Sequence, residues 1–350
     1  MPAPDPGVVD VAVVGAGIAG LTAASRLERA GRSVVVLDKG RSVGGRLATR
    51  RLGGATLDHG AQFLTARSDA FVREVGAWVS AGVVHEWCRG FDDVPDGHPR
   101  YAARGGMNRI ATQLATAVAD VRVGVQVMSV GPAPAGWQLT WAGGALTAGT
   151  VILTAPVPQS LALLDAGGSE LGPDVAAGLR AITYEPTIAL LLVLDGPPAV
   201  PHPGARKPQD GPFDIVVDNV AKGASTEPAL TLHLRPALSA TRSEEADGDL
   251  LDDLVPRAAD WIGDAAVLEA VVKRWRYATP TATWPDACCT AATGPAGPVV
   301  LAGDAFAGPR VEGAWLSGVA AAEAATRPAA EAAIGPAAGP AAEPAAGPAA

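Results

Sequence analysis

The sequence predicts an α/β protein of two domains, the first built on a parallel sheet and the second on a mixed sheet. Three observations predict it. An apolar strand runs into a glycine-rich turn, a helical segment and a second apolar strand within residues 8–38. The chain of 350 residues is longer than one hydrophobic core usually holds. From Val157 to about Val272 its character changes, and strands separated by proline- and glycine-rich loops follow.

The first unit begins with a strand over Val8–Val14, which leads into the turn Gly15-Ala16-Gly17-Ile18-Ala19-Gly20. A helix follows over Leu21–Ala30, and a strand over Val34–Leu37 ends at Asp38. Strand, glycine-rich turn, helix, strand and acid in this order form the dinucleotide-binding unit in its full context. We therefore predict a Rossmann-like first domain.

Each residue type in this unit has a physical reason. Gly15 permits the tight turn, Gly17 lets the backbone approach a pyrophosphate, and Gly20 lets the helix pack close to the strand. The start of the helix offers free N–H groups and a positive dipole end to phosphates, and Asp38 can accept ribose hydroxyls. The predicted contacts at this end of the nucleotide are Gly15, Ala16, Gly17, Ile18, Ala19, Gly20, Asp38 and Lys39.

Composition and charge exclude several classes of function. The net charge is −9 and lysine is scarce, which disfavours nucleic acid and anionic membranes as partners. The longest strongly apolar run, Ile188–Leu194, is too short to cross a bilayer, and the N-terminus does not resemble a signal peptide. Cys88, Cys288 and Cys289 suit neither a disulfide framework nor zinc spacing, and the five histidines form no metal motif. We expect a cytoplasmic protein without metal, as a monomer or homodimer.

The remaining elements follow from apolar patterning. Helices are predicted at Met107–Val118, Pro158–Leu164, Glu244–Ile262 and from Glu312 to about Ala325. Strands are predicted at Val121–Val130, Trp137–Thr140, Leu146–Leu153, Thr187–Asp195, Phe213–Asp218, Ala229–Leu234 and Val299–Ala302, with another beginning at Lys273. The segment 327–350 is almost wholly Ala, Pro, Gly and Glu and is predicted to be a disordered tail.

Five segments carry a resemblance to a known family: DKGRSVGGRLATRR, LDHGAQFLTAR, RYAARGGMNRIATQLA, KRWRYATP and LAGDAFAGPRVEGAWLSG. They are spread over nearly the whole ordered chain. In these segments the sequence resembles the FAD-dependent amine oxidase superfamily, and within it the bacterial renalase-like proteins. Asp38 departs from the pattern, because a glutamate is frequent there. The resemblance implies a Rossmann-like FAD-binding domain of the glutathione-reductase type beside a mixed-sheet substrate domain.

The resemblance also implies the residues that contact the rest of the cofactor. Arg46, which follows two glycines, could reach a phosphate, and Asp304 could accept hydrogen bonds from the ribityl chain. Each also has a plainer interpretation, as a surface arginine and a turn-capping aspartate. Gln62 could instead be a buried amide that satisfies a loop, and Val127 could equally be an ordinary strand residue. The full implied set is Gly45, Arg46, Ala61, Gln62, Val127, Gly303, Asp304, Glu312, Ala314 and Trp315.

The final helix has an implied electronic role. A helix that begins near Glu312 would point its positive end at the pyrimidine side of the flavin and stabilise the reduced, anionic form. The implied division of the chain is 1–68, 101–156 and 273–326 for the FAD-binding domain, and 69–100 and 157–272 for the substrate domain.

Two residues are candidates for substrate chemistry. In the alternating strand ALTLHLRP, His233 and Arg235 are expected on one face, where they could meet a polar, phosphorylated substrate. Trp275 is expected to share a strand face with Lys273 and Tyr277 and to line the substrate cavity, with Arg276 on the other face. An exposed polar strand face for His233 and plain core packing for Trp275 are the alternatives.

The resemblance implies an oxidase that converts 2- and 6-dihydro isomers of NAD(P)H to NAD(P)⁺ while O₂ becomes hydrogen peroxide. No general base is needed, because loss of hydride already gives an aromatic pyridinium. The alternatives are another oxidase or desaturase of the superfamily, acting on an amine or on a carotenoid-like or porphyrinogen-like substrate, and a non-catalytic flavin-binding protein. We rank amine oxidation lower, because apart from Lys39 at the nucleotide end Lys273 is the only lysine in a matching segment, and tyrosine is scarce.

Overall fold

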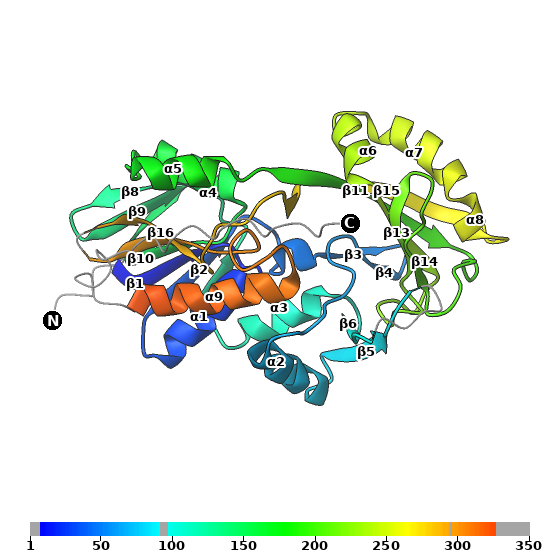
Figure 1. Ribbon diagram of the computed structural model, residues 1–350, viewed down its shortest axis with the longest axis horizontal. Helices are drawn as coiled ribbons and strands as arrows, with labels where there is room; N and C mark the ends of the chain where they lie inside the picture. The colour runs from blue at the N-terminus through cyan, green and yellow to red at the C-terminus, as the bar shows by residue number, and fades with distance from the viewer. Residues whose placement is uncertain (1–7, 92–96, 295, 327–350) are drawn as a thin grey trace, which may run out of the picture.

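The computed structural model describes residues 8–91, 97–294 and 296–326. Two sheets lie side by side in it, each with helices packed on it (Figure 1). The predicted tail at 327–350 lies outside the described residues. No helix in the described ranges is long and apolar enough to span a bilayer.

The first sheet is parallel at its centre. Strand β1 (Val8–Val14) pairs in parallel with β2 (Val34–Asp38) and β10 (Gly144–Leu153), because helical crossovers return the chain to the same edge. The order is β16-β17-β10-β1-β2-β7, and β9 and β8 continue from β10 as an antiparallel hairpin. The bounds are β7 Val121–Val123, β8 Val127–Ala133, β9 Gly136–Trp141, β16 Cys289–Thr293 and β17 Pro298–Leu301.

Apolar side chains that alternate along β1 build a core on each face of this sheet. Val11 and Val13 face the helices α1 (Ile18–Arg29), α2 (Asp69–Ser80), α3 (Asn108–Ala115) and α9 (Val311–Thr326). Ala12 and Val14 face the β8–β9 hairpin, α4 (Val157–Ala166) and α5 (Pro173–Arg180). Helices α1 and α9 lie against each other across the front of the sheet (Figure 1).

The second sheet has the order β12-β13-β14-β11-β15 and is antiparallel. Its strands are β11 (Tyr184–Leu194), β12 (Ala205–Arg206), β13 (Phe213–Asp218), β14 (Ala229–Leu234) and β15 (Val267–Pro280). One face is covered by α6 (Pro236–Thr241), α7 (Asp247–Arg257) and α8 (Ala259–Ile262).

The opposite face of the second sheet meets the first part of the chain. The hairpin of β3 (Thr49–Leu52) and β4 (Ala55–Asp58) packs there on Ala189, Leu191 and Val193. This hairpin follows the short helix η1 (Gly45–Leu47) directly, so the glycine-rich segment leads straight into the part of the chain that packs on the second sheet. A further ribbon consists of β5 (Val84–Cys88) and β6 (Arg100–Ala103).

Several predicted elements differ from those observed. The strand predicted at Val121–Val130 is two strands, since the positive φ of Gly124 turns the chain between them. The helix predicted from Glu244 begins at Asp247 and gives way to a separate short helix after Arg257, next to Pro256. Strand β15 begins before Lys273, and its residues on both sides of the implied domain boundary at 272/273 pair with β11.

Helix α2 also differs from its expected place. Its residues Phe71, Val75 and Trp78 lie in the same core as Trp315 of α9, although 69–100 is grouped with the substrate domain in the sequence analysis. The face of α2 that carries these residues is apolar, and it packs on the first sheet's helices rather than on the second sheet.

Candidate active site

The glycine-rich turn after β1 has the shape that a pyrophosphate requires. Gly15 has a φ of +110° and donates its N–H to the Leu37 carbonyl at 2.8 Å. A Cβ on Gly20 would lie 2.0 Å from the Gly15 carbonyl oxygen, whereas around Gly17 there is open space. No side chain of the described residues caps α1, so the N–H groups of its first turn are open to an anion.

Asp38 closes this turn. Its carboxylate accepts hydrogen bonds from the backbone N–H groups of Ala16 and Gly40, both at 2.6 Å. The acid therefore shapes the loop besides being available to a ribose. Lys39 extends outward, where its ammonium lies 3.4 Å from Gln159 Oε1. Val127 begins β8 as a buried core residue, and Val125 just before it donates to the Asp38 carbonyl.

Two further loops adjoin the turn. Gly44 and Gly45 both have positive φ, and a Cβ on Gly45 would come within 3.4 Å of Gly17 Cα. Ala61 donates its N–H to the Arg46 carbonyl, and a Cβ on Gly60 would lie 2.0 Å from that same oxygen. The segments 15–20, 44–46 and 59–62 therefore lie next to one another and form one continuous wall of backbone. A side chain in place of Gly20 or Gly60 would collide with this wall.

Arg46 and Asp304, each predicted to hold the cofactor, hold each other in the structure. The guanidinium makes two hydrogen bonds of 2.5 Å to the carboxylate and a third, at 3.1 Å, to the Ala278 carbonyl. This fork-like pairing joins η1 to the end of β17 and to β15. Beside it, burial and the Asp304 carboxylate raise the pKa of Tyr184 to about 12.

The start of α9 is fixed by side chains that turn away from the wall. Glu312 accepts hydrogen bonds from Ser68 N–H and Ser68 Oγ, both at 2.7 Å, and so binds the N-terminus of α2. Trp315 is buried against Phe71, and Ala314 lies in the same core. Any contact of Glu312 or Trp315 with a flavin would therefore come from backbone. Gly318 in the same helix packs against Ala19, which brings α9 to the glycine-rich turn.

A buried charged cluster lies at the junction of the two sheets. Lys222 is fully buried, and its ammonium lies 2.9 Å from Asp58 Oδ2 and donates to Gln62 Oε1 at 2.8 Å. Asp58 Oδ1 accepts from Met107 N–H at 2.8 Å. Because Lys222 holds the amide oxygen of Gln62, the amide nitrogen is directed to the Asp58 and Gly60 carbonyls.

Two histidines near this cluster are neutral at physiological pH. Burial, followed by the charge of the nearby Lys222, lowers the pKa of His233 to about 4. Its Nε2 lies 3.3 Å from Gln62 Nε2. Burial, followed by the charge of Lys273, also lowers the pKa of His59 to about 4. A neutral imidazole of this kind is a weak base and carries no charge to repel a cationic neighbour.

Trp275 forms a flat wall with His59. The two rings stack with centroids 5.3 Å apart and an interplanar angle of 19°, and Trp275 Nε1 donates to the His59 carbonyl at 2.7 Å. Trp275 pairs with Thr187 and Lys273 with Ala189, so both point to the face that meets the β3–β4 hairpin. The register then shifts between Glu185 and Thr187, which interrupts the predicted alternation before Tyr277.

Arg235 does not lie where the sequence predicts it. Strand β14 ends at Leu234, and Arg235 caps α6 instead of continuing the alternation. Its guanidinium donates to the carbonyls of Pro208, Gln209 and Gly211. The prediction that it shares the face of His233 is therefore wrong, because the helix start reverses the chain.

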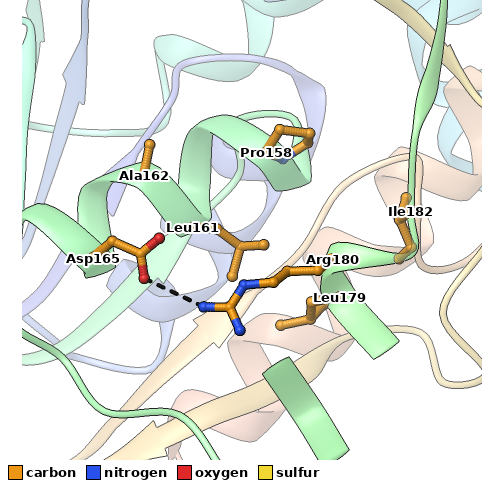
Figure 2. A pocket seen from close by; sticks show the side chains of 7 residues that line it. All are labelled: Pro158, Leu161, Ala162, Asp165, Leu179, Arg180 and Ile182. Atoms are coloured by element: carbon orange, nitrogen blue, oxygen red, sulfur yellow. Dashed lines mark ion pairs between the residues drawn. The ribbon is translucent and has the colours of Figure 1, made fainter. Parts of the chain in front are cut away.

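A separate pocket of about 250 Å³ lies between α4 and α5 (Figure 2). Asp165 and Arg180, 3.7 Å apart, pair across it. Its lining residues are Pro158, Leu161, Ala162, Asp165, Leu179, Arg180 and Ile182. None of these belongs to the backbone wall or to the charged cluster, and we assign the pocket no role.

The residues present fit an FAD. The open first turn of α1 and the glycines of the wall suit the pyrophosphate, which needs donors and close backbone approach. Glu312 lies six residues before Gly318, about 9 Å along α9, so the two ends of one extended cofactor can reach both regions. The fold and the site define a flavoprotein of the Rossmann type.

Comparison with known proteins agrees with this class. Residues 13–75 match the NAD(P)-binding Rossmann-like domain, and residues 82–326 match the model of the flavin-containing amine oxidoreductases. The chain belongs to the flavin-containing amine oxidoreductase family, and its cofactor is FAD. The predictions of an α/β fold, of FAD and of an FAD-dependent oxidoreductase are confirmed.

A relative is a candidate flavin-containing monoamine oxidase (AofH) of Mycobacterium tuberculosis, 48% identical over 65 residues. The match spans 19% of this chain and only 14% of that relative.

Solved structures share the fold over nearly their whole length. A candidate protoporphyrinogen oxidase from Exiguobacterium sp. 255-15 has a TM-score of 0.68 and 14% identity, over 92% of this chain and 99% of that one. A putrescine oxidase bound to putrescine has a TM-score of 0.70 and 16% identity, over 90% and 98%. An oxidoreductase from Methanosarcina mazei has a TM-score of 0.63 and 15% identity, over 90% and 100%. At these identities the likeness concerns the fold.

The sequence analysis missed the residue that organises the centre of the site. Lys222 lies in a loop outside every matching segment, and no spacing in the sequence links it to Asp58. A lysine flanked by small residues after an apolar strand is ordinarily a solvent-exposed residue, so its burial could not be read from its neighbours.

Proposed function

We propose that this chain is an FAD-dependent oxidase of dihydronicotinamide dinucleotides, acting on the 2- and 6-dihydro isomers of NAD(P)H. The substrate loses two electrons and a hydrogen nucleus as hydride and becomes NAD(P)⁺. With one further proton, O₂ is reduced to hydrogen peroxide, so the reaction balances. When bound, FAD supplies the two-electron acceptor between substrate and oxygen.

The observation that supports this proposal is that the two histidines and the lysine at the buried charged cluster are poorly suited to abstract a proton. His59 and His233 have pKa values of about 4, and the Lys222 ammonium is bound by Asp58 and Gln62. A dihydronicotinamide needs no proton abstraction, since loss of hydride leaves a stable aromatic ring. The flat Trp275–His59 pair offers a surface against which such a ring can lie.

The side chains then have distinct tasks. Trp275 and His59 would hold the nicotinamide parallel to the flavin, with the reacting atoms about 3–3.5 Å apart. Lys222 would keep Gln62 in one orientation, so that its amide stays directed to the loop of residues 58–60. Arg46 and Asp304 would hold η1 and β17 together beneath the ring.

Oxidation of an amine is the second candidate, and Lys222 favours it. Amine oxidation ranks lower from the sequence because, apart from Lys39 at the nucleotide end, only Lys273 lies in a matching segment, but the structure adds a buried lysine next to Gln62. Putrescine oxidase shares the fold, and the relative noted above carries a monoamine oxidase name. Against this candidate, Lys222 is paired with Asp58 rather than free to hold a water molecule.

The test is anaerobic mixing of the flavin-loaded protein with each candidate reductant in a stopped-flow spectrometer. We expect the yellow flavin band to bleach faster with the 2- and 6-dihydro isomers than with ordinary NADH or with putrescine. Admission of air should restore the band and release one hydrogen peroxide per substrate. Faster bleaching with putrescine would establish amine oxidation instead, and no bleaching with any reductant would leave a non-catalytic flavoprotein.

A further inference from the structure

Two strands of the second sheet, β14 and β15, place polar side chains in one row across β11, toward the FAD-binding side. In the register, Ala189 of β11 pairs with His233 of β14 on one side and with Lys273 of β15 on the other. Cross-strand partners share a face, so Lys273 points the same way as His233. Trp275 lies on this face two residues further along β15.

Arg50 approaches the same face from the opposite side. It pairs with Leu57 in the β3–β4 hairpin, and Leu57 is buried against Ala189 and Leu191 of the second sheet. Arg50 therefore shares the hairpin face that packs on β11 and β15. Arg51 next to it is on the other hairpin face and exposed.

Neither Arg50 nor Lys273 has an ion pair or a side-chain hydrogen bond to any described residue, and Nε of Arg50 is buried without a partner. The nearby His59 ring contributes a second buried nitrogen, Nδ1, that also lacks one. On the opposite face of β15, Arg274 pairs with Asp247. Buried donors without partners are rare in folded proteins, so their presence at one place points to a ligand.

The electrostatics of the row agree with an anionic ligand. Burial and then the charge of Arg50 lower the pKa of the Lys273 ammonium, Asp247 partly opposes this shift, and Arg41 adds to it. Positive charge is thus concentrated here in a chain whose net charge is −9. A diphosphate would remove the mutual repulsion of these groups and accept a fork of hydrogen bonds from the arginine.

We propose that Arg50 and Lys273 form a binding subsite for the diphosphate of a dinucleotide substrate, next to the Trp275–His59 wall. The identity of the whole substrate rests on the proposed function, whereas the chemistry of the subsite, two linked phosphates, does not. FAD also contains a diphosphate. The uncapped turn at the start of α1 already provides for that group, which is why we assign this second subsite to the substrate.

The test measures binding of ADP and of inorganic pyrophosphate to the flavin-loaded protein by titration calorimetry. We expect both to bind, and Arg50→Met and Lys273→Met to weaken each by about tenfold or more. Arg51→Met is the matched control and should bind as the wild type does. Lys273→Arg should retain binding, which separates loss of charge from loss of packing. Equal binding by wild type and both methionine variants would overturn the subsite.

Two further readouts separate the possible sources of the phosphates. Loss of FAD from Arg50→Met and Lys273→Met, with ADP binding unchanged after reloading, would assign the cations to the cofactor and overturn the proposal. With the dihydro isomers, the same variants should raise the KM for the dinucleotides but not for the corresponding dihydronicotinamide ribosides, which lack phosphate. If no isomer reduces the flavin, the proposed function fails, while the ADP titration still decides the subsite.

Discussion

Replacement of Lys222 by methionine isolates the buried ion pair at the centre of the molecule. The ammonium and the Asp58 carboxylate are both fully buried and 2.9 Å apart, and Asp58 Oδ2 has no other hydrogen-bond partner in the described chain. Removal of one partner from such a pair leaves an uncompensated buried charge, at a cost of about 3–5 kcal/mol. For a protein of this size, that corresponds to a fall in Tm of about 4–8 °C.

The assay is thermal unfolding at saturating FAD, followed by circular dichroism, with the exposed Lys207→Met as the control. The double variant Asp58→Asn with Lys222→Met should recover at least about half of the loss, because it removes both charges together. The flavin spectrum of Lys222→Met should also shift, since Gln62 loses the donor that orients its amide. A Tm within a degree or so of the control would show that this pair does not stabilise the fold, and the reasoning would be refuted.

Three other predictions follow from contacts described above. Gly20→Val should yield colourless protein that does not take up FAD, as absorbance after dialysis against FAD would show, because its Cβ would overlap the Gly15 carbonyl. The free energy of unfolding should fall as the pH drops from about 6.5 to about 4, because His59 and His233 become protonated in the unfolded chain but stay neutral in the folded protein. A plot of Tm against pH should be flatter for His233→Gln than for the wild type. Glu312→Gln should lower the free energy of unfolding by about 1 kcal/mol in urea, since α2 loses a carboxylate at its N-terminus, and an unchanged value would contradict this assignment.

The nucleotide end of the protein was readable from the sequence because its determinants are local. The strands β1 and β2 were predicted within a residue. The need for glycine follows from the positive φ of Gly15 itself and from the close approach of Gly20 to the Gly15 carbonyl oxygen, five residues away in the chain. Strands β13 and β14 were predicted with their observed bounds, since short apolar runs between turn residues carry their own signal. The predicted division into domains remains a prediction.

The centre of the site was not readable in the same way. Lys222, Asp58 and Gln62 come from a loop of the second sheet, a strand of the hairpin and the loop that follows it. Their pairing depends on how the hairpin lies on the sheet. For Arg235 the local pattern was misleading. Strand alternation predicts it beside His233, but the strand ends at Leu234 and Arg235 is the N-cap of α6.

The sequence by itself therefore determined the dinucleotide-binding unit and most strands, because backbone conformation and apolar periodicity are set by residues close in the chain. The glycine-rich motif alone does not distinguish NAD from FAD, and FAD was expected from the resemblance of five segments to a known family. Only the tertiary structure decided which charged groups are paired and which are left free. The pairing of Arg46 with Asp304, the pairing of Lys222 with Asp58, and the lack of a partner for Arg50 among the described residues are outcomes of contacts between distant segments. A charge costs much when buried alone and little when paired, and no local pattern records which of the two a residue will meet.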